Sequence, residues 1–119
     1  MSRWGRIVEI RDEVVPIRSA LRNAFISFEE MTVSVVALVT DARRDGRPVV
    51  GYGFHSAGRY AQQGILRERL IPRLLKAPAE ALGEDGGERL DPRRAWSVMM
   101  ANEKPGGHGE RAVAVAALD

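Results

Sequence analysis

The chain has 119 residues, of which 45% are hydrophobic and 29% charged, a mixture typical of one globular domain with a single core. It contains no cysteine, which excludes disulfide cross-links and cysteine-ligated metal sites. No run of about 20 apolar residues is present, so no membrane-spanning segment is predicted, and the N-terminus lacks the apolar stretch of a signal peptide. We therefore expect a cytoplasmic protein.

The basic residues are almost all arginine, because Lys76 and Lys104 are the only lysines among 18 basic residues. The formal net charge is +2, and 16 acidic residues are interleaved with the arginines. A nucleic-acid-binding protein would gather its arginines in a basic block that includes aromatic residues, and the sequence has no such block. The pattern favours a solvated arginine-rich surface, with nucleic-acid binding as the rival hypothesis.

The first part of the chain predicts a strand followed by a loop. Residues 6–14 alternate imperfectly between apolar and polar side chains, which is typical of a strand. The residues expected on one face are Val8, Ile10 and Val14. Pro16 is expected to end this strand. Residues 17–30 show no clean period and predict an ordered loop.

Residues 32–40 predict a central strand, because they are rich in β-branched residues and apolar on both faces. The dipeptide Asp45-Gly46 is a strong hairpin signal. Residues 48–54 then return as a third strand. The three segments together predict an antiparallel meander.

The second half of the chain predicts helices. Residues 62–76 carry an apolar stripe opposite arginines, and Pro72 is expected to kink or split this helix. The stripe consists of Ile65, Leu66, Leu70, Leu74 and Leu75. Residues 77–82 predict a short helix. Strands followed by helices indicate an α+β fold, a three-stranded antiparallel β-meander followed by a helical bundle on one face of the sheet.

Two further helices follow. Asp91 is a plausible N-cap with Pro92 at the first helical position. The residues at core spacing in that helix are Trp96, Met99 and Met100. Gly109-Glu110 is expected to open the last helix, an alanine- and valine-rich run over residues 112–118.

Lys104 lies in the glycine-rich segment 102–111. Pro105 disfavours helical geometry for this lysine, and the neighbouring glycines allow a backbone to approach a ligand closely. A lysine held against a cleft can bind a carboxylate or transfer a proton. The alternative is a solvated lysine that complements the dipole of a helix end. The segment lacks the Gly-Lys-Ser/Thr ending of a phosphate-binding loop.

His55 and His108 are the only histidines, and neither has a second ligand at helical spacing, so no metal site is predicted. His55 lies in a small polar loop, residues 55–61, where it could contact a ligand or be exposed to solvent. No Ser/His/Asp or paired-carboxylate arrangement stands out in the sequence.

Four stretches resemble the N-terminal capping domain of the enolase superfamily, in its mandelate racemase/muconate lactonizing branch. They are residues 17–24, 48–54, 67–73 and 102–111. The last is the most specific, and the resemblance extends over essentially the whole chain. It is strongest to acid-sugar dehydratases of the D-tartrate dehydratase type.

The resemblance implies a cap that covers the mouth of a (β/α)7β barrel. In that family the barrel supplies the Mg²⁺-binding acids, a Lys-x-Lys base and a histidine acid, and this chain contains no Lys-x-Lys motif and no third histidine. We therefore expect residues 1–111 to be the cap, and residues 112–119 to be the truncated start of the helix that leads into the absent barrel. The isolated chain is expected to be inactive and to need no cofactor, with Mg²⁺ serving the parent enzyme.

The resemblance also assigns site residues. Lys104 matches a cap lysine that reaches the substrate, and residues 21–30 and 54–61 correspond to two specificity loops. The residues expected to contact substrate in these loops are Arg22, Asn23, His55 and Tyr60. The segment 55–57 departs from the asparagine-rich pattern of tartrate enzymes, so the resemblance leaves the acid sugar open.

The expected partners follow from this hypothesis. An acid-sugar substrate would bind only together with a barrel, and neither nucleic acid nor membrane is expected to bind. The last helix and the underside of the cap would expose apolar surface, which favours a homo-oligomer. An alternative is a stand-alone regulatory or interaction subunit of a full-length paralogue.

Overall fold

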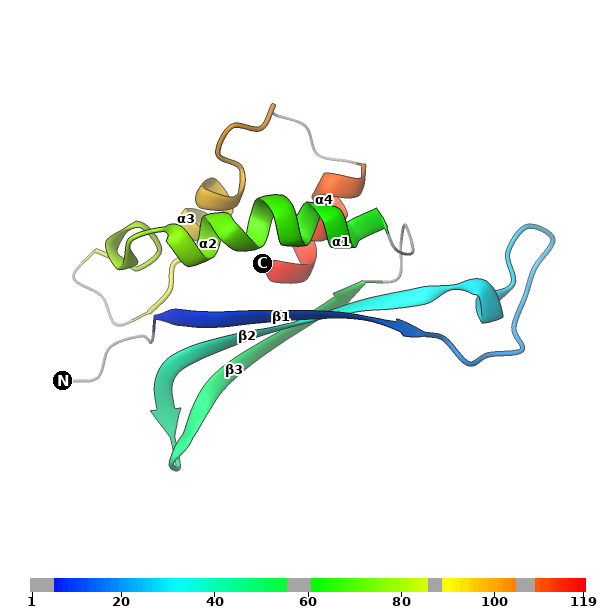
Figure 1. The fold of residues 1–119 in the computed structure, drawn as a ribbon, viewed down its shortest axis with the longest axis horizontal. Helices are drawn as coiled ribbons and strands as arrows, with labels where there is room; N and C mark the ends of the chain where they lie inside the picture. The colour runs from blue at the N-terminus through cyan, green and yellow to red at the C-terminus, as the bar shows by residue number, and fades with distance from the viewer. Residues whose placement is uncertain (1–5, 56–60, 86–88, 105–108) are drawn as a thin grey trace.

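The computed structural model describes residues 6–55, 61–85, 89–104 and 109–119. Three strands come first and helices follow, as Figure 1 shows. The strands are β1 (Ile7–Pro16), β2 (Thr32–Arg44) and β3 (Arg47–His55). The helices are α1 (Ala61–Ile65), the π-helical turn η2 (Leu66–Leu70), α2 (Ile71–Lys76), α3 (Pro92–Met99) and α4 (Glu110–Leu118). Two 3-10 turns, η1 (Phe28–Glu30) and η3 (Ala79–Ala81), complete the set. The predicted α+β meander followed by helices is confirmed.

The sheet has the order β1-β2-β3, and both pairings are antiparallel, so β2 is central as its two apolar faces predicted. The predicted hairpin turn is also confirmed. Asp45 and Gly46 have φ values of 53° and 78°, the positive φ pair of a type I′ turn that matches the twist of the flanking strands.

A bulge near the start of β1 corrects the predicted face pattern. Ile7 pairs with Thr40 and Glu9 pairs with Val39, so the register shifts between them. Val8 is 55% exposed, whereas Ile10 is buried. The prediction that Val8 shares the buried face is wrong because strict alternation fails where a bulge inserts an extra residue.

The helices lie on one side of the sheet only, above it in Figure 1. Alternate residues of β2 point toward them, and Val36 on that side is 2% exposed. The core joins the two layers. Its buried apolar members are Ile10, Val36, Leu66, Leu70, Ile71, Leu74, Leu82, Met99, Ala114, Val115 and Ala117.

The predicted helix over residues 62–76 is present, but it is α-helical only at its two ends. Its middle turn, η2, is π-helical. The π-helical turn η2 ends at Leu70, two residues before Pro72, which has no N–H to donate and whose ring would crowd a regular preceding turn. Leu66, Leu70 and Leu74 are buried as the stripe predicted. Leu75 is 42% exposed, contrary to prediction, because one residue turns about 100° away from the stripe.

Helix α3 begins as the sequence predicted. The Asp91 Oδ1 atom accepts a hydrogen bond of 2.9 Å from the backbone N–H of Arg93, and Pro92 is the first helical residue. Met99 is fully buried, which confirms it as a core residue. Trp96 is 48% exposed and lines a surface groove between α3 and α4, so its predicted place in the core is wrong.

Helix α4 contacts β2 and β3, and its buried residues are Ala114, Val115 and Ala117. It begins at Glu110 after Gly109, as predicted, and the domain boundary proposed after Arg111 stays a prediction. Within the described segments, no helix combines the length and apolar character needed to cross a bilayer.

Candidate functional site

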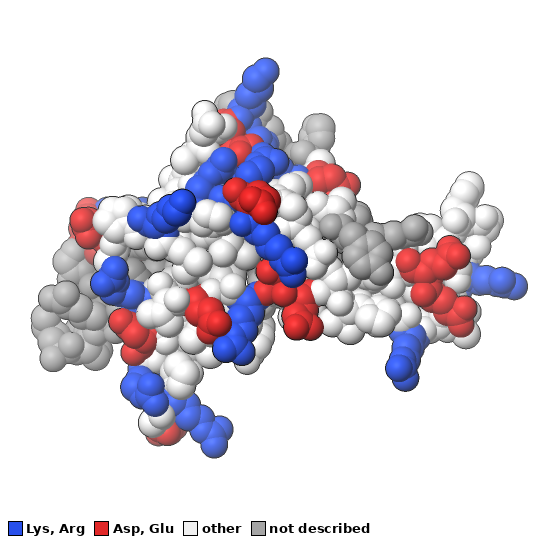
Figure 2. Space-filling model, in the orientation of Figure 1, with Lys and Arg blue, Asp and Glu red and all other residues white. Residues whose placement is uncertain are grey.

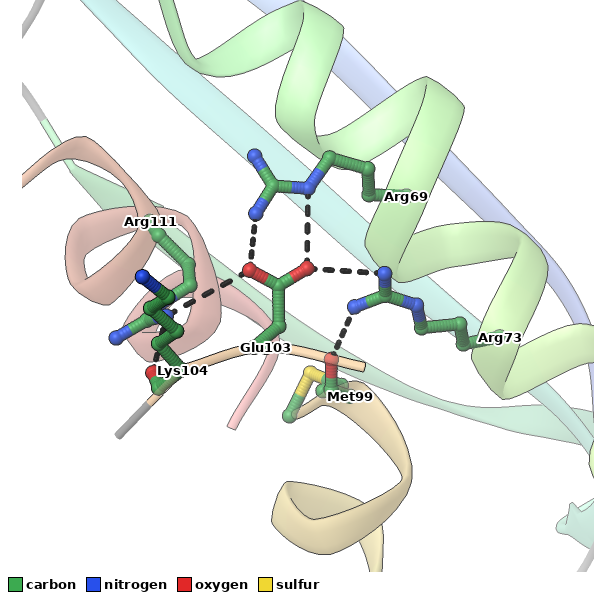
Figure 3. A network of polar contacts seen from close by, with 6 residues as sticks. All are labelled: Arg69, Arg73, Met99, Glu103, Lys104 and Arg111. Carbon is green, nitrogen blue, oxygen red and sulfur yellow. Dashed lines mark hydrogen bonds and ion pairs between the residues drawn. The ribbon is translucent and has the colours of Figure 1, made fainter. Parts of the chain in front are cut away.

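The segment that contains Lys104 is organised around the carboxylate of Glu103, whose side chain is only 9% exposed (Figure 3). Arg69 donates to both carboxylate oxygens, with 3.2 Å between its Nε and Oε2. The Arg73 Nη2 atom lies 2.9 Å from Oε2, and the Arg111 Nη1 atom lies 3.5 Å from Oε1. One carboxylate therefore receives three guanidinium groups.

These groups come from segments far apart in the sequence. Arg69 lies in η2 and Arg73 in α2, four residues apart and so on the same helical face. Arg111 lies in the first turn of α4. The Arg73 Nη1 atom also donates to the carbonyl oxygen of Met99 at 2.7 Å, which satisfies a carbonyl at the end of α3. Through these arginines, Glu103 links the segment between α3 and α4 to the helix formed by η2 and α2 and to the first turn of α4.

The charges at this cluster do not cancel. Three arginines share the one carboxylate of Glu103, so these four groups together carry a net positive charge. The hydrogen bond from Arg69, and next the one from Arg73, hold the pKa of Glu103 below its usual value. The carboxylate is therefore ionised at neutral pH and keeps the arginines in place.

The backbone of Lys104 is fixed while the residue itself is exposed. The Arg111 Nη1 atom donates to the Lys104 carbonyl oxygen at 2.6 Å, and Asn102 turns the chain with a φ of 62°. Helix α3 ends at Met99, so Lys104 lies beyond the last turn in which a cation complements the helix dipole. The helix-end alternative therefore does not account for this position.

We expect Glu103→Gln to lower the melting temperature at pH 7 by several degrees, because an amide cannot compensate three guanidinium groups. The folded-state pKa lies below the ordinary value of 4.5, so the carboxylate contributes its full stability above that pH. That contribution is lost as the pH falls through the folded-state pKa. Thermal melts of both proteins from pH 7 to pH 3 should therefore converge in acid. A constant difference across this range would contradict the assigned role.

Residues 17–31, here called the arm, form the connection between β1 and β2, which projects from one end of the sheet (Figure 1). The backbone N–H of Ile17 donates to the Met31 carbonyl at 3.1 Å and closes its base. The Asn23 Oδ1 atom accepts from the backbone N–H groups of Phe25 and Ile26 at 2.8 and 2.9 Å. The amide oxygen of Asn23 therefore stabilises the turn of the arm.

The structure brings some predicted site residues together and separates others. His55 is the last residue of β3 and pairs with Ser34, three residues after the arm ends at Met31, so His55 and the arm share one end of the sheet. Arg22 and Asn23 lie in the arm, whereas Lys104 lies in the segment between α3 and α4; in Figure 1 the arm projects from one end of the sheet, away from that segment. Tyr60 and residues 105–108 lie outside the described residues.

Two buried hydroxyl groups near His55 were not predicted. Thr32 and Ser34 are 4% and 2% exposed on the helix-covered face of β2, and within the described segments their side-chain oxygens have no hydrogen-bond partner. The signal available in the sequence was that these two polar residues are two positions apart in an otherwise apolar strand, and therefore on the same face. They make this end of the core polar.

The residues around Glu103 were also not assigned a role from sequence. The available signals were two arginines at helical spacing, Arg69 and Arg73, and an acid directly before Lys104. In the described part of the chain, no three His, Asp or Glu side chains gather closely enough to hold a metal ion. No known protein-family model matches the chain.

Proposed function

We propose that this chain is a capping domain of the enolase-superfamily type, which supplies substrate-contacting groups to a barrel that dehydrates an acid sugar with Mg²⁺. The observation that carries the proposal is the Glu103 cluster. It fixes the backbone of Lys104, leaves this residue exposed and places three arginines on the neighbouring carboxylate of Glu103.

Two of the four stretches that resemble the family meet at this cluster. Arg69 and Arg73 belong to residues 67–73, and Glu103 and Arg111 belong to residues 102–111. The fold supports the proposal as well, because a three-stranded meander followed by helices is the architecture that the resemblance implies. Local motifs and tertiary contacts thus support the same assignment.

The chemistry available to this chain is binding rather than turnover. The Lys104 ammonium group can donate charge-assisted hydrogen bonds to a substrate carboxylate, and the neighbouring arginines strengthen the attraction. Proton abstraction next to a carboxylate needs a base and a group that stabilises the enediolate. We assign both to the barrel, so the chain alone should not dehydrate any acid sugar when Mg²⁺ is added.

Carboxylate binding can be tested on the chain itself, because its only lysines are Lys76 and Lys104. Reductive ¹³C-methylation labels both, and Lys104→Ala assigns the signals. Specific binding of the whole substrate is assigned to the cap together with a barrel, but the Lys104 ammonium group alone is expected to attract a carboxylate weakly, so titration with D-tartrate should shift the Lys104 signal with a dissociation constant in the millimolar range. Lys76, which is exposed at the end of α2, serves as the matched control, and its signal should not shift. Threitol, which lacks the carboxylates, should shift neither signal.

Equal responses of the two lysines to D-tartrate would count against the proposed role of Lys104. Dehydration of an acid sugar by the purified chain would contradict the assignment of turnover to a barrel. The two results are independent, since the first concerns recognition and the second concerns chemistry.

The arrangement of charges argues against the rival hypothesis of nucleic-acid binding. Figure 2 shows basic and acidic residues interspersed over the face in view. Arg67 lies 2.8 Å from the carboxylate of Asp12, and Arg94 lies 2.6 Å from that of Asp85. Arginines that are paired with acids release fewer counterions from a phosphate backbone, which weakens binding.

A further inference from the structure

The face of the sheet that turns away from the helices is apolar over β2 and β3. We call it the open face; its apolar residues include Val33, Val35, Ala37, Val39, Tyr52 and Phe54. Residues directly opposite one another in an antiparallel pair share a face, and Tyr52 pairs with Ala37 and Phe54 with Val35. Among the described residues, no helix lies against this side of the sheet (Figure 1).

Two aromatic side chains dominate the open face. Tyr52 is 78% exposed and Phe54 is 74% exposed, and they stand two residues apart on β3 beside the valine row of β2. A contiguous apolar patch with aromatic side chains is typical of the buried centre of a protein interface. The open face therefore has the composition of a docking surface.

The charges on this face indicate what docks there. Strand β1 contributes Glu9, Arg11 and Glu13, which pair with open-face residues of β2 and so point to the same side. The row alternates negative, positive, negative, and the Arg11 Nε atom lies 2.9 Å from the Glu9 carboxylate. The net charge of this row is negative, which disfavours binding of the open face to an anionic lipid surface or a nucleic acid. An alternating row is instead complementary to a reversed copy of itself that is offset by one position of the row.

We propose that the open faces of two copies of this chain pack together as a twofold-symmetric, two-sheet sandwich. A twofold axis across the strands places β1 over β1 and β3 over β3 with reversed directions. When the rows are offset by one residue pair, each Arg11 meets a glutamate of the other copy. The Tyr52 and Phe54 side chains then fill the space of about 10 Å between the sheets.

The size of the face predicts the strength of this dimer. Three strands about 4.8 Å apart, paired over nine residues with a rise of about 3.4 Å each, give a footprint of roughly 450 Å² per copy. Stable complexes usually bury about 800 Å² per partner. We therefore expect a reversible dimer with a dissociation constant in the micromolar range.

Sedimentation velocity of the intact chain, from low micromolar to near-millimolar concentration, tests the proposal. The wild type is expected to pass from monomer to dimer over this range. The double variant Tyr52→Lys/Phe54→Lys is expected to raise the dissociation constant at least about tenfold. Phe25→Lys is the matched control, because Phe25 is 94% exposed in the arm and away from the open face, and it should dimerise like the wild type.

The charge row gives a second test that does not remove apolar surface. Arg11→Glu leaves three acids in a row and should weaken the dimer. The triple variant Glu9→Arg/Arg11→Glu/Glu13→Arg restores alternation with the signs reversed and should dimerise like the wild type. All five positions substituted in these variants are exposed, so we expect each variant to fold. Circular dichroism verifies this.

A wild type that stays monomeric throughout, or a dimer that survives the Tyr52/Phe54 double variant, overturns the proposal. Binding of the wild type to phosphatidylserine vesicles that is lost in this double variant also overturns it, because the open face would then serve a lipid surface. The inference does not depend on the proposed function, and none of these outcomes bears on carboxylate binding at Lys104.

Discussion

Replacing Gly53 by alanine is expected to destabilise the domain by about 3 kcal/mol, at the upper end of the usual cost of overpacking. An added Cβ atom would lie 1.9 Å from the carbonyl oxygen of Ala117 and 3.0 Å from its carbonyl carbon. Both are backbone atoms, so no side-chain rotation relieves the contact. Helix α4 would have to move off β3 and give up part of its packing in the core. Urea denaturation followed by circular dichroism measures the loss.

Gly51→Ala is the matched control. Gly51 lies two residues earlier on the same strand and on the same side of the sheet, but its added Cβ atom has nothing within 4 Å. Alanine there should leave stability unchanged or raise it by a few tenths of a kcal/mol, because it restricts the unfolded chain. If both variants lost the same stability, the close packing of α4 on β3 would be refuted.

The second large effect is expected for Leu66→Ala. Leu66 is fully buried in the π-helical turn η2, and shortening a buried leucine to alanine costs about 2–5 kcal/mol through lost burial and the cavity left behind. Domains of this kind have a total stability of about 5–15 kcal/mol, so the variant should unfold at a much lower urea concentration.

Leu21→Ala is the control for this substitution, because Leu21 is 71% exposed in the arm. Its effect should stay within about 0.5 kcal/mol. A Leu66→Ala protein as stable as the Leu21→Ala protein would show that η2 does not contribute to the core.

Local signals in the sequence were sufficient for most of the fold. Asp45-Gly46 predicted the hairpin turn and Asp91-Pro92 predicted the start of α3, because each acts through its own backbone geometry. The side of β2 that the helices cover could not be predicted, since both of its faces carry valines. The bulge at Val8 was missed for a similar reason, because only pairing with β2 reveals the extra residue.

The candidate site was predicted only in part. The sequence singled out Lys104 through its glycine-rich neighbours, but the contact of Glu103 with Arg69 joins residues 34 positions apart and no local spacing indicates it. Substrate contact by Asn23 stays a prediction. The structure adds that the Asn23 amide oxygen already holds the turn of the arm, a common task of asparagine that sequence reasoning could have considered.

The packing of α4 on the sheet has a consequence for biosynthesis. A nascent chain leaves the ribosome from its N-terminus, so the three strands emerge long before residues 110–118 do. Until then, the part of the sheet around Gly53 and Val36 has no α4 to cover it, and Tyr52 and Phe54 are uncovered on the other side. During translation the meander is therefore the segment at which we expect chaperones to act.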